Sequence, residues 1–241
     1  MTTTMTAYAA TALAKGWAFD TNFKFSQASA AALLASPLLT PKRTVKRYVS
    51  LGSPSPSDIT VVERDEIFVA GWQNLGLVQH VEMPHWIASP QDGQKHGAAA
   101  VTHAQLVGYP VGCHIGVDIE GLGNAGAPVQ QYATAWATEI KNAGYLALVY
   151  DGYDDGMPDA VKLALVAAGL VRPGDWWSDF GPRKLPAGLT WLLKQHSQTT
   201  IGGVVVDPDE ILVDNALIVM GVAVDAGDPA AGSAPDEPHA A

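Results

Sequence analysis

The sequence contains a single cysteine, Cys113. One thiol can form no intramolecular disulfide and cannot build a cysteine-based zinc site. Because Cys113 stands in an apolar run, we predict a small buried thiol in the core. The seven histidines show no HExxH spacing or other metal-ligand pattern, so His80, His85, His96 and His103 are expected to be structural or exposed.

Basic residues are also scarce, with 14 Lys and Arg against 24 Asp and Glu and a formal net charge of −10. Phosphate backbones and anionic lipid surfaces repel such a chain, so we expect neither nucleic acid nor a membrane as partner. No apolar run of about 18 residues predicts a transmembrane helix. The N-terminal residues lack the basic region of a signal peptide, so we expect synthesis in the cytoplasm. A target in the cell wall would then require delivery by a non-classical route.

The two ends of the chain differ in composition from the rest. Residues 1–14 are uncharged and rich in Thr and Ala, which predicts a flexible lead-in over residues 1–15. Residues 225–241 hold three prolines and four acids but no Lys or Arg, a composition typical of a disordered tail. No linker interrupts residues 16–224, so we predict one domain there.

Within that domain, short apolar runs alternate with helical patterns. Strands are predicted at residues 17–20, 44–51, 77–82, 113–120, 145–151, 176–180, 189–196 and 217–222. Helices are predicted at residues 26–35, 60–75, 91–107, 128–143 and 158–168. Gly76, Gly108, Gly144 and Gly169 follow helical runs, where a left-handed residue is favoured.

This alternation is typical of parallel strands joined by crossover helices. Eight strands favour an α/β fold with a single (β/α)8 TIM-type barrel. An open doubly wound sheet is the alternative, but its Gly-rich fingerprint is missing after the first strand, where the chain reads FDTNFKF.

The segment CHIGVDIEG, residues 113–121, carries the clearest chemical signal. Side chains alternate along a strand, so Asp118 and Glu120 share one face and the apolar odd-numbered residues share the other. The two acids lie about 6.5–7 Å apart at Cα, so we expect one of them to retain a proton. Glycoside hydrolysis requires one protonated carboxyl and one carboxylate. Loop capping or pairing with a base is the alternative.

Further acids stand at the ends of other apolar runs. Asp20 ends the first predicted strand, Asp151 ends the fifth, and Asp207 follows the β-branched run VVV. The C-terminal strand ends of a barrel meet at one rim, where active sites lie. We therefore expect these acids to converge there with Asp118 and Glu120. The remaining acids of the neighbouring loops are expected to be solvated: Asp154, Asp155, Asp209 and Glu210.

Several segments, taken in order, resemble one known family. They read GWAFDTNF, ITVVERDEIFVAGWQNLGL, DGQKHGAAAVTHAQLVGYP, IGVDIEG, VQQYATAWATEIKNAGYLALVYDGY and LKQHSQTTIGGVVVDPD. Over residues 16–223 this order is similar to that of the Rv2525c-like glycoside-hydrolase-like domains, also called DUF1906, which are distant relatives of the family 25 lysozymes. His196 departs from the pattern, since the family commonly has Tyr after this Gln.

The resemblance implies roles for individual residues. Glu120 matches the proton donor, and Asp118 matches the acid that orients or stabilises. Asp20 and Asp207 match the first-strand and late acids of the same catalytic group. Contacts to substrate are expected from Asp151, Tyr150, Trp177 and Gln195.

These implications favour a glycoside hydrolase that cleaves β-1,4 bonds in a peptidoglycan-type wall glycan without a metal or organic cofactor. Since a fold does not fix a function, a non-catalytic module is the alternative. Such a module would bind glycan, or serve as a structural or cargo part of a phage or secretion particle. An enzyme acting on phosphorylated substrates is disfavoured, because no Gly-rich phosphate cradle is found.

We predict that a chain ending at Val224 keeps the melting temperature of the full chain. Residues 225–241 carry too little apolar surface to offset the entropy lost on ordering. Thermal unfolding of both chains, followed by circular dichroism, tests this. A fall of several degrees in the shortened chain would show that the tail docks on the domain.

Overall fold

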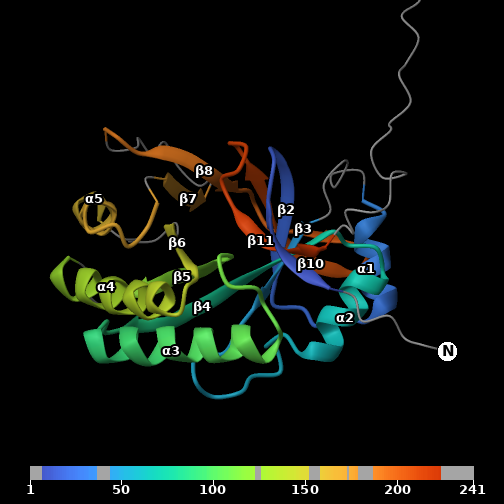
Figure 1. Cartoon of the computed structure of the whole chain (residues 1–241), viewed down its shortest axis with the longest axis horizontal. Helices are drawn as coiled ribbons and strands as arrows, with labels where there is room; N and C mark the ends of the chain where they lie inside the picture. Colours follow the sequence, from blue (N-terminus) through green and yellow to red (C-terminus); the bar gives the residue numbers. More distant parts are fainter. Residues whose placement is uncertain are drawn as a thin grey trace, which may run out of the picture.

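In a computed structural model, the chain forms a strongly curved β-sheet with helices along its outer side (Figure 1). The structure describes residues 7–36, 44–122, 126–151, 158–172, 174–178 and 187–223. Within these ranges, the side chains of residues 82–84, 151 and 174–178 are outside the description.

The described strands join into one sheet. Their bounds are β1 Tyr8–Ala12, β2 Gly16–Thr21, β3 Thr44–Tyr48, β4 Asn74–Trp86, β5 His114–Leu122, β6 Leu146–Asp151, β7 Gly174–Ser178, β8 Thr190–Gln195, β9 Thr199–Ile201, β10 Val204–Ile211 and β11 Ile218–Val222. Neighbouring strands follow the order β1-β11-β4-β3-β2-β10-β8-β7-β6-β5, and β9 pairs with β10. A further pairing joins β4 to β5 in parallel, so the sheet curls round on itself.

The predicted (β/α)8 TIM-type barrel is wrong, because the sheet is mixed and irregular. Strand β10 runs antiparallel to both of its long neighbours, β2 and β8. Strand β11 runs antiparallel to β1 and β4. The regular strand–helix alternation does not continue after β8, because β8 to β11 follow one another with no helix between them. Strands β9 and β10 form a hairpin through the turn at Gly202 and Gly203, and this hairpin reverses the chain before β10.

The predicted strands themselves are all present, but the last one has a different place. The run at 217–222 became β11, which pairs with β1 and the start of β4. The position between β2 and β8 belongs to β10, which was not predicted. Pro208 lies in the middle of β10, and a proline ordinarily argues against an inner strand. Part of the expected lead-in is also strand, since β1 lies within residues 1–15.

Five helices lie at the predicted positions. Their bounds are α1 Gln27–Leu34, α2 Val61–Val69, α3 Pro90–Leu106, α4 Ala127–Asn142 and α5 Asp159–Ala167. Ser26 and Thr60 cap α1 and α2 through their side chains, as is usual for these residue types. Helix α2 ends earlier than predicted, at Val69, and Gly76 lies in β4 instead of ending the helix. In the described part of the chain, no helix has both the length and the apolar character needed to cross a bilayer.

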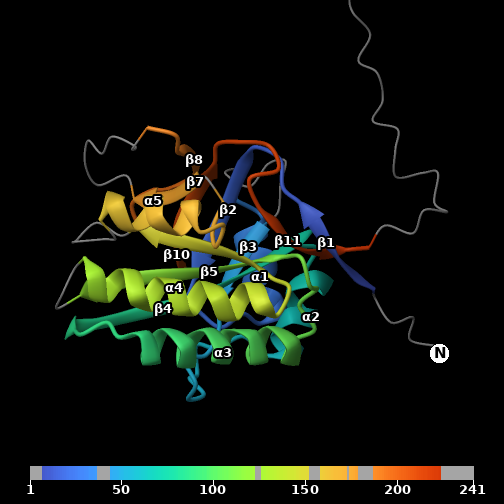
Figure 2. The same ribbon diagram turned by 60° about the vertical axis from the view of Figure 1, so that its left-hand side comes forward.

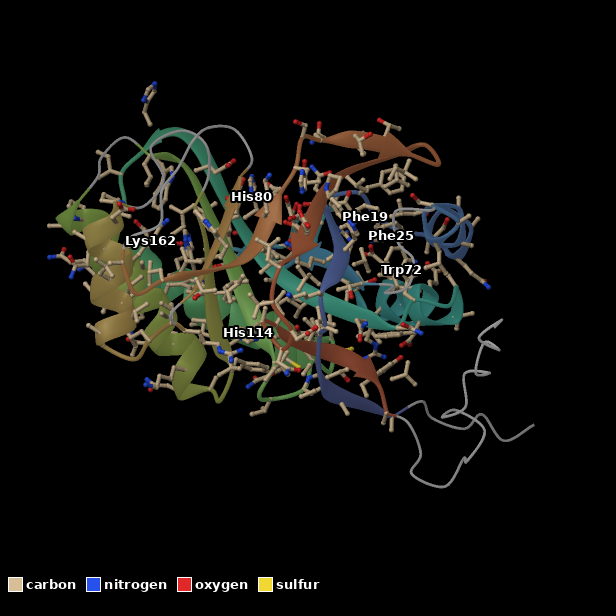
Figure 3. All side chains as sticks on the ribbon, turned by 90° about the horizontal axis from the view of Figure 1, so that it is seen from above. Phe19, Phe25, Trp72, His80, His114 and Lys162 are labelled. Atoms are coloured by element: carbon tan, nitrogen blue, oxygen red, sulfur yellow. The ribbon has the colours of Figure 1, made fainter. Side chains whose placement is uncertain are left out.

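The helices pack in two groups. Helices α3, α4 and α5 lie along the β4–β6 side of the sheet, and α1 and α2 lie at the other end (Figures 1 and 2). The apolar face of β5 meets the first group as predicted, with Cys113, Ile115 and Val117 fully buried. Figure 3 shows the packing of the second group, where Phe25 lies against Trp72 with ring centroids 6.5 Å apart.

Helices α3 and α4 approach each other closely because α3 carries glycine at the contact. A Cβ atom added at Gly93 would lie 2.2 Å from the backbone oxygen of Tyr132. One added at Gly97 would lie 2.9 Å from the backbone oxygen of Trp136. This contact holds α3 and α4 together behind β4 and β5, the strands that carry part of the site described below.

We predict that Gly93→Ala lowers the free energy of unfolding by about 1–3 kcal/mol, because the two helix backbones must separate. Helix propensity alone would favour alanine by about 1 kcal/mol, so the sign of the change is informative. Urea unfolding measures it. The matched control is Gln94→Ala, an exposed position on the same helix, which should change stability by less than about 0.5 kcal/mol. A Gly93→Ala chain as stable as the wild type would contradict the close contact.

Candidate active site

A cavity of about 280 Å³ lies at the rim where β2, β4 and β5 end. Five of the predicted site residues line it: Asp118, Glu120, Tyr150, Gln195 and Asp207. The other described residues of its lining are Thr21, Asn22, Tyr48, His80, Gln198 and Val205.

Strand register brings these side chains together. In neighbouring parallel strands, Asp118 pairs with His80 on one side and with Tyr150 on the other. Asp20 pairs with Lys46 in β3. The antiparallel direction of β10 places Asp207 opposite Asp20. The start of β10 therefore reaches the rim where the parallel strands end.

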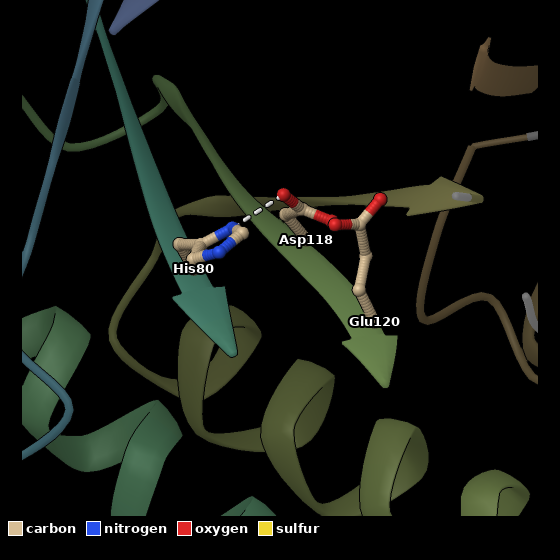
Figure 4. Close-up of side chains that lie close together, drawn as sticks. All are labelled: His80, Asp118 and Glu120. Atoms are coloured by element: carbon tan, nitrogen blue, oxygen red, sulfur yellow. Dashed lines mark hydrogen bonds and ion pairs between the residues drawn. The ribbon is translucent and has the colours of Figure 1, made fainter. Parts of the chain in front are cut away.

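The side chains of Asp118 and His80 form a hydrogen bond. The Nδ1 atom of His80 lies 2.5 Å from Oδ2 of Asp118 (Figure 4). Burial raises the pKa of Asp118, and the hydrogen bond and charge of His80 act against that rise. The other carboxylate oxygen of Asp118, Oδ1, is buried and has no hydrogen-bond partner among the described residues. Figure 4 shows the carboxyl group of Glu120 beside it.

Asp20 does not line the cavity but lies directly behind it, 2% exposed. Its Oδ2 atom is 3.2 Å from Nζ of Lys46 and accepts a hydrogen bond of 3.1 Å from Nε2 of Gln195. The Oε1 atom of Gln195 in turn accepts a hydrogen bond from the hydroxyl of Tyr150. Lys46 also pairs with Asp209 at 2.7 Å. The buried carboxylate of Asp20 thus holds Gln195, a residue of the cavity lining, in place.

The carboxyl group of Asp207 has a raised pKa. Burial, followed by the charge of Asp20, raises the pKa of Asp207 to about 7. The same negative field reaches Tyr48, whose pKa lies well above its ordinary value because of burial and the nearby carboxylates. The Tyr48 ring stacks on His80, with centroids 5.2 Å apart and planes at 14°.

Several predicted residues differ from expectation. Asp209 was expected to be a solvated acid but is fully buried against Lys46, because the unpredicted β10 carries it into the sheet. His80 was expected to be structural or exposed, whereas it lines the cavity. His96 and His103 are structural: His96 is hydrogen-bonded to Tyr132 of α4, and His103 to the backbone of Ser50 and Ile59 between β3 and α2. The side chains of Asp151 and Trp177, and all of Asp154 and Asp155, lie outside the described residues.

The sequence analysis did not predict Tyr48 and His80 in the lining of the cavity, or Lys46, which pairs with Asp20. A signal for them was available, because Lys46 and Tyr48 alternate along one predicted strand and His80 lies on the inward face of the next. The deciding information was the register that places His80 beside Asp118. A strand pattern alone does not contain it.

The geometry permits acid–base chemistry. Asp118 and Glu120 provide two carboxyl groups that face one cavity, and the hydrogen bond to His80 favours the charged form of Asp118 against the effect of burial. One atom each of His80, Asp118 and Glu120 lie within 4.8 Å of one another, a set that also offers donors to a cation. No Lys or Arg is among the described residues of the cavity lining.

The family model of the Rv2525c-like, glycoside hydrolase-like domain matches residues 38–202. No curated protein matches the sequence significantly. Among solved structures, an uncharacterized protein of B. stearothermophilus superposes with a TM-score of 0.60 at 17% identity, over 81% of this chain and 95% of the other.

Two further structures share the fold. The Tat-secreted protein Rv2525c of Mycobacterium tuberculosis, in complex with HEPES, gives a TM-score of 0.57 at 17% identity over 82% of this chain and 96% of its own. The modular autolysin LytC of Streptococcus pneumoniae, in complex with a synthetic peptidoglycan ligand, gives 0.56 at 11% identity over 81% of this chain and 46% of its own.

The raised pKa of Asp207 predicts that stability falls as the pH rises from about 4 to about 7. Over this window the folded chain holds a proton on Asp207 that the unfolded chain has released, so rising pH favours unfolding. Asp207→Asn should flatten this slope and make the protein more stable than wild type at pH 8. Urea unfolding at pH 5 and pH 8 measures both effects.

The control for this experiment is Asp214→Asn, at an exposed aspartate outside the cavity that accepts a hydrogen bond from the backbone of Lys15. Asparagine keeps the accepting oxygen, so the control should retain the wild-type slope. An unchanged slope in Asp207→Asn would show that Asp207 ionises as it does in water.

Proposed function

The chain belongs to the Rv2525c-like family of glycoside hydrolase-like domains, and from this premise we propose that it hydrolyses the glycan strand of a peptidoglycan-type polymer. The observation that carries the proposal is the pair Asp118 and Glu120, which face one cavity from the same strand. Their environments differ, and such differences divide the acid and base roles of two carboxyl groups.

Glu120 is the proposed proton donor. It lies nearer the end of β5 and is only partly buried, whereas Asp118 is 7% exposed, so Glu120 is the group that a substrate reaches. Two carboxylates on one face of a strand repel each other, so ionisation of both in one cavity is disfavoured. Protonation of the glycosidic oxygen by Glu120 leaves Asp118 as the carboxylate that stabilises the positive charge at the anomeric carbon.

His80 is the proposed positioning group for Asp118. Its hydrogen bond favours the charged form of Asp118, which burial by itself disfavours. Stacking on Tyr48 holds the imidazole ring in place. Asp20 and Asp207 complete the acidic group, and Tyr150 and Gln195 are the proposed contacts to substrate.

The closeness of the acidic pair argues against inversion of the anomeric configuration by these two groups alone. Inverting enzymes hold their two carboxyl groups about 6.5–9.5 Å apart to admit a water molecule, and retaining ones about 5–5.5 Å. Atoms of Asp118 and Glu120 lie within 4.8 Å of each other. Asp118, or an acetamido group of the substrate itself, would then assist from the opposite side of the leaving group.

The shape of the site suits a polymer. A second cavity, of about 190 Å³, shares Asn22, Tyr48 and His80 with the first and continues towards the serine-rich loop at residues 53–58. The two adjoining cavities extend the site beyond the acidic residues. The peptidoglycan ligand of LytC supports this substrate class, because LytC has a related fold.

We predict that Glu120→Gln lowers the release of reducing ends from purified peptidoglycan by about 10²–10⁴-fold, because glutamine cannot supply the proton. Asp118→Asn should also be severe, since the charge beside the reacting carbon is lost. Both variants should fold, because each removes one member of a confined like-charge pair.

The matched control is Glu210→Gln, the same substitution on β10 at a residue that does not line the cavity. It should retain wild-type activity. Equal rates for Glu120→Gln and wild type would refute the assignment of the acid. Wild-type inactivity on several bacterial walls, together with binding to them, would instead support the alternative of a non-catalytic glycan-binding module.

A further inference from the structure

We infer that His80, Asp118 and Glu120 form a binding site for one divalent cation of the zinc type. This inference goes beyond the proposed hydrolysis and does not depend on it. It rests on the positions of three donor groups, on one buried oxygen that lacks a partner, and on the sign of the surrounding charge.

The donor geometry is close to what a cation requires. One nitrogen of His80 and one oxygen from each acid lie within 4.8 Å of one another. Zinc binds nitrogen and carboxylate oxygen at about 2.0–2.2 Å in a tetrahedral arrangement, so two donors on one ion lie about 3.4 Å apart. Small rotations of the side chains therefore suffice to place all three around a common centre.

A buried oxygen points to a ligand at this place. Asp118 is 7% exposed, and its Oδ1 atom has no hydrogen-bond partner among the described residues. The carboxyl group of Glu120 lies beside it (Figure 4). A buried acceptor without a donor is costly, and a second carboxylate beside it adds repulsion unless a proton or a cation lies between them.

The wider charge of the site also favours a cation. Asp20 and Asp207 lie within electrostatic reach of Asp118. The positive charge of Lys46 acts on Asp118 and Asp207, but Lys46 forms its ion pairs with Asp20 and Asp209. The ammonium group of Lys46 therefore lies beside Asp20 and Asp209, and it does not separate the carboxyl groups of Asp118 and Glu120.

The mixture of donors selects the class of metal. An imidazole nitrogen with two carboxylates suits zinc and similar transition metals, whereas magnesium and calcium prefer oxygen donors alone. Three protein ligands leave a fourth position open towards the cavity. Groups outside the ligands hold this arrangement: Tyr48 stacks on His80, and Nε1 of Trp86 donates to the backbone oxygen of Glu120 at 2.7 Å.

The test is calorimetric titration of the full chain with zinc chloride after removal of metals with a chelator. We expect saturable binding of one ion, and no comparable binding of magnesium chloride. His80→Gln and Glu120→Gln should each weaken zinc binding by at least about tenfold, the loss seen even when an outer-shell partner of a metal is removed. The thermal melt of each variant verifies that it is folded.

The matched control is His196→Gln. His196 forms the other described histidine–acid contact, 3.3 Å from Glu210, away from the cavity. This variant should bind zinc as the wild type does. Absence of saturable zinc binding in the wild type, or equal affinity in the wild type, His80→Gln and Glu120→Gln, would overturn the inference.

These outcomes are separable from those of the hydrolysis assay. A chain that binds zinc but releases no reducing ends refutes the proposed hydrolysis alone. A chain that hydrolyses glycan but binds no zinc refutes the cation site alone. If both proposals hold, zinc should inhibit hydrolysis, because the cation displaces the proton that Glu120 must donate.

Discussion

The buried ammonium group of Lys46 holds together the strands that form one side of the site. It joins Asp20 of β2 to Asp209 of β10, and all three side chains are at most 3% exposed. Leaving a charge of this kind buried and unpaired costs about 3–5 kcal/mol. The pairing therefore specifies that β10 lies beside β2, and this position carries Asp207 to the rim. Gln195 extends the same network to Tyr150.

Lys46 does not line the front of the cavity. Asp118, Glu120 and Asp207 line it, and no described lining residue is Lys or Arg. Several carboxyl groups in a half-buried space repel one another unless they bind protons or a cation. The raised pKa values of Asp118 and Asp207 mean that these two groups bind protons more readily than in water. The proposed acid catalysis and the proposed cation site are two consequences of this one electrostatic condition.

Prediction from the pattern was most successful where a strand is followed by its own helix. Residues 113–120 were assigned correctly to two faces because one face is uniformly apolar and contacts α3 and α4. It was least successful after residue 190, where β8 to β11 follow one another without helices and the β9–β10 hairpin reverses the chain. Strand β10 contains Pro208 and was not predicted, so Asp209 was expected to be solvated although it is fully buried. Histidine patterns were uninformative for His80, because its partner is 38 residues away.

The amino-acid sequence by itself determined the positions of the helices and most strands, the buried Cys113, and the presence of acids at strand ends. These are local properties, set by the periodicity of apolar side chains and by capping residues. The tertiary structure alone decided which strands are neighbours, in which direction β10 runs and which residue faces which. Register between distant strands depends on packing over the whole sheet. That register brings His80 to Asp118, Lys46 to Asp20, and Asp207 to the same rim.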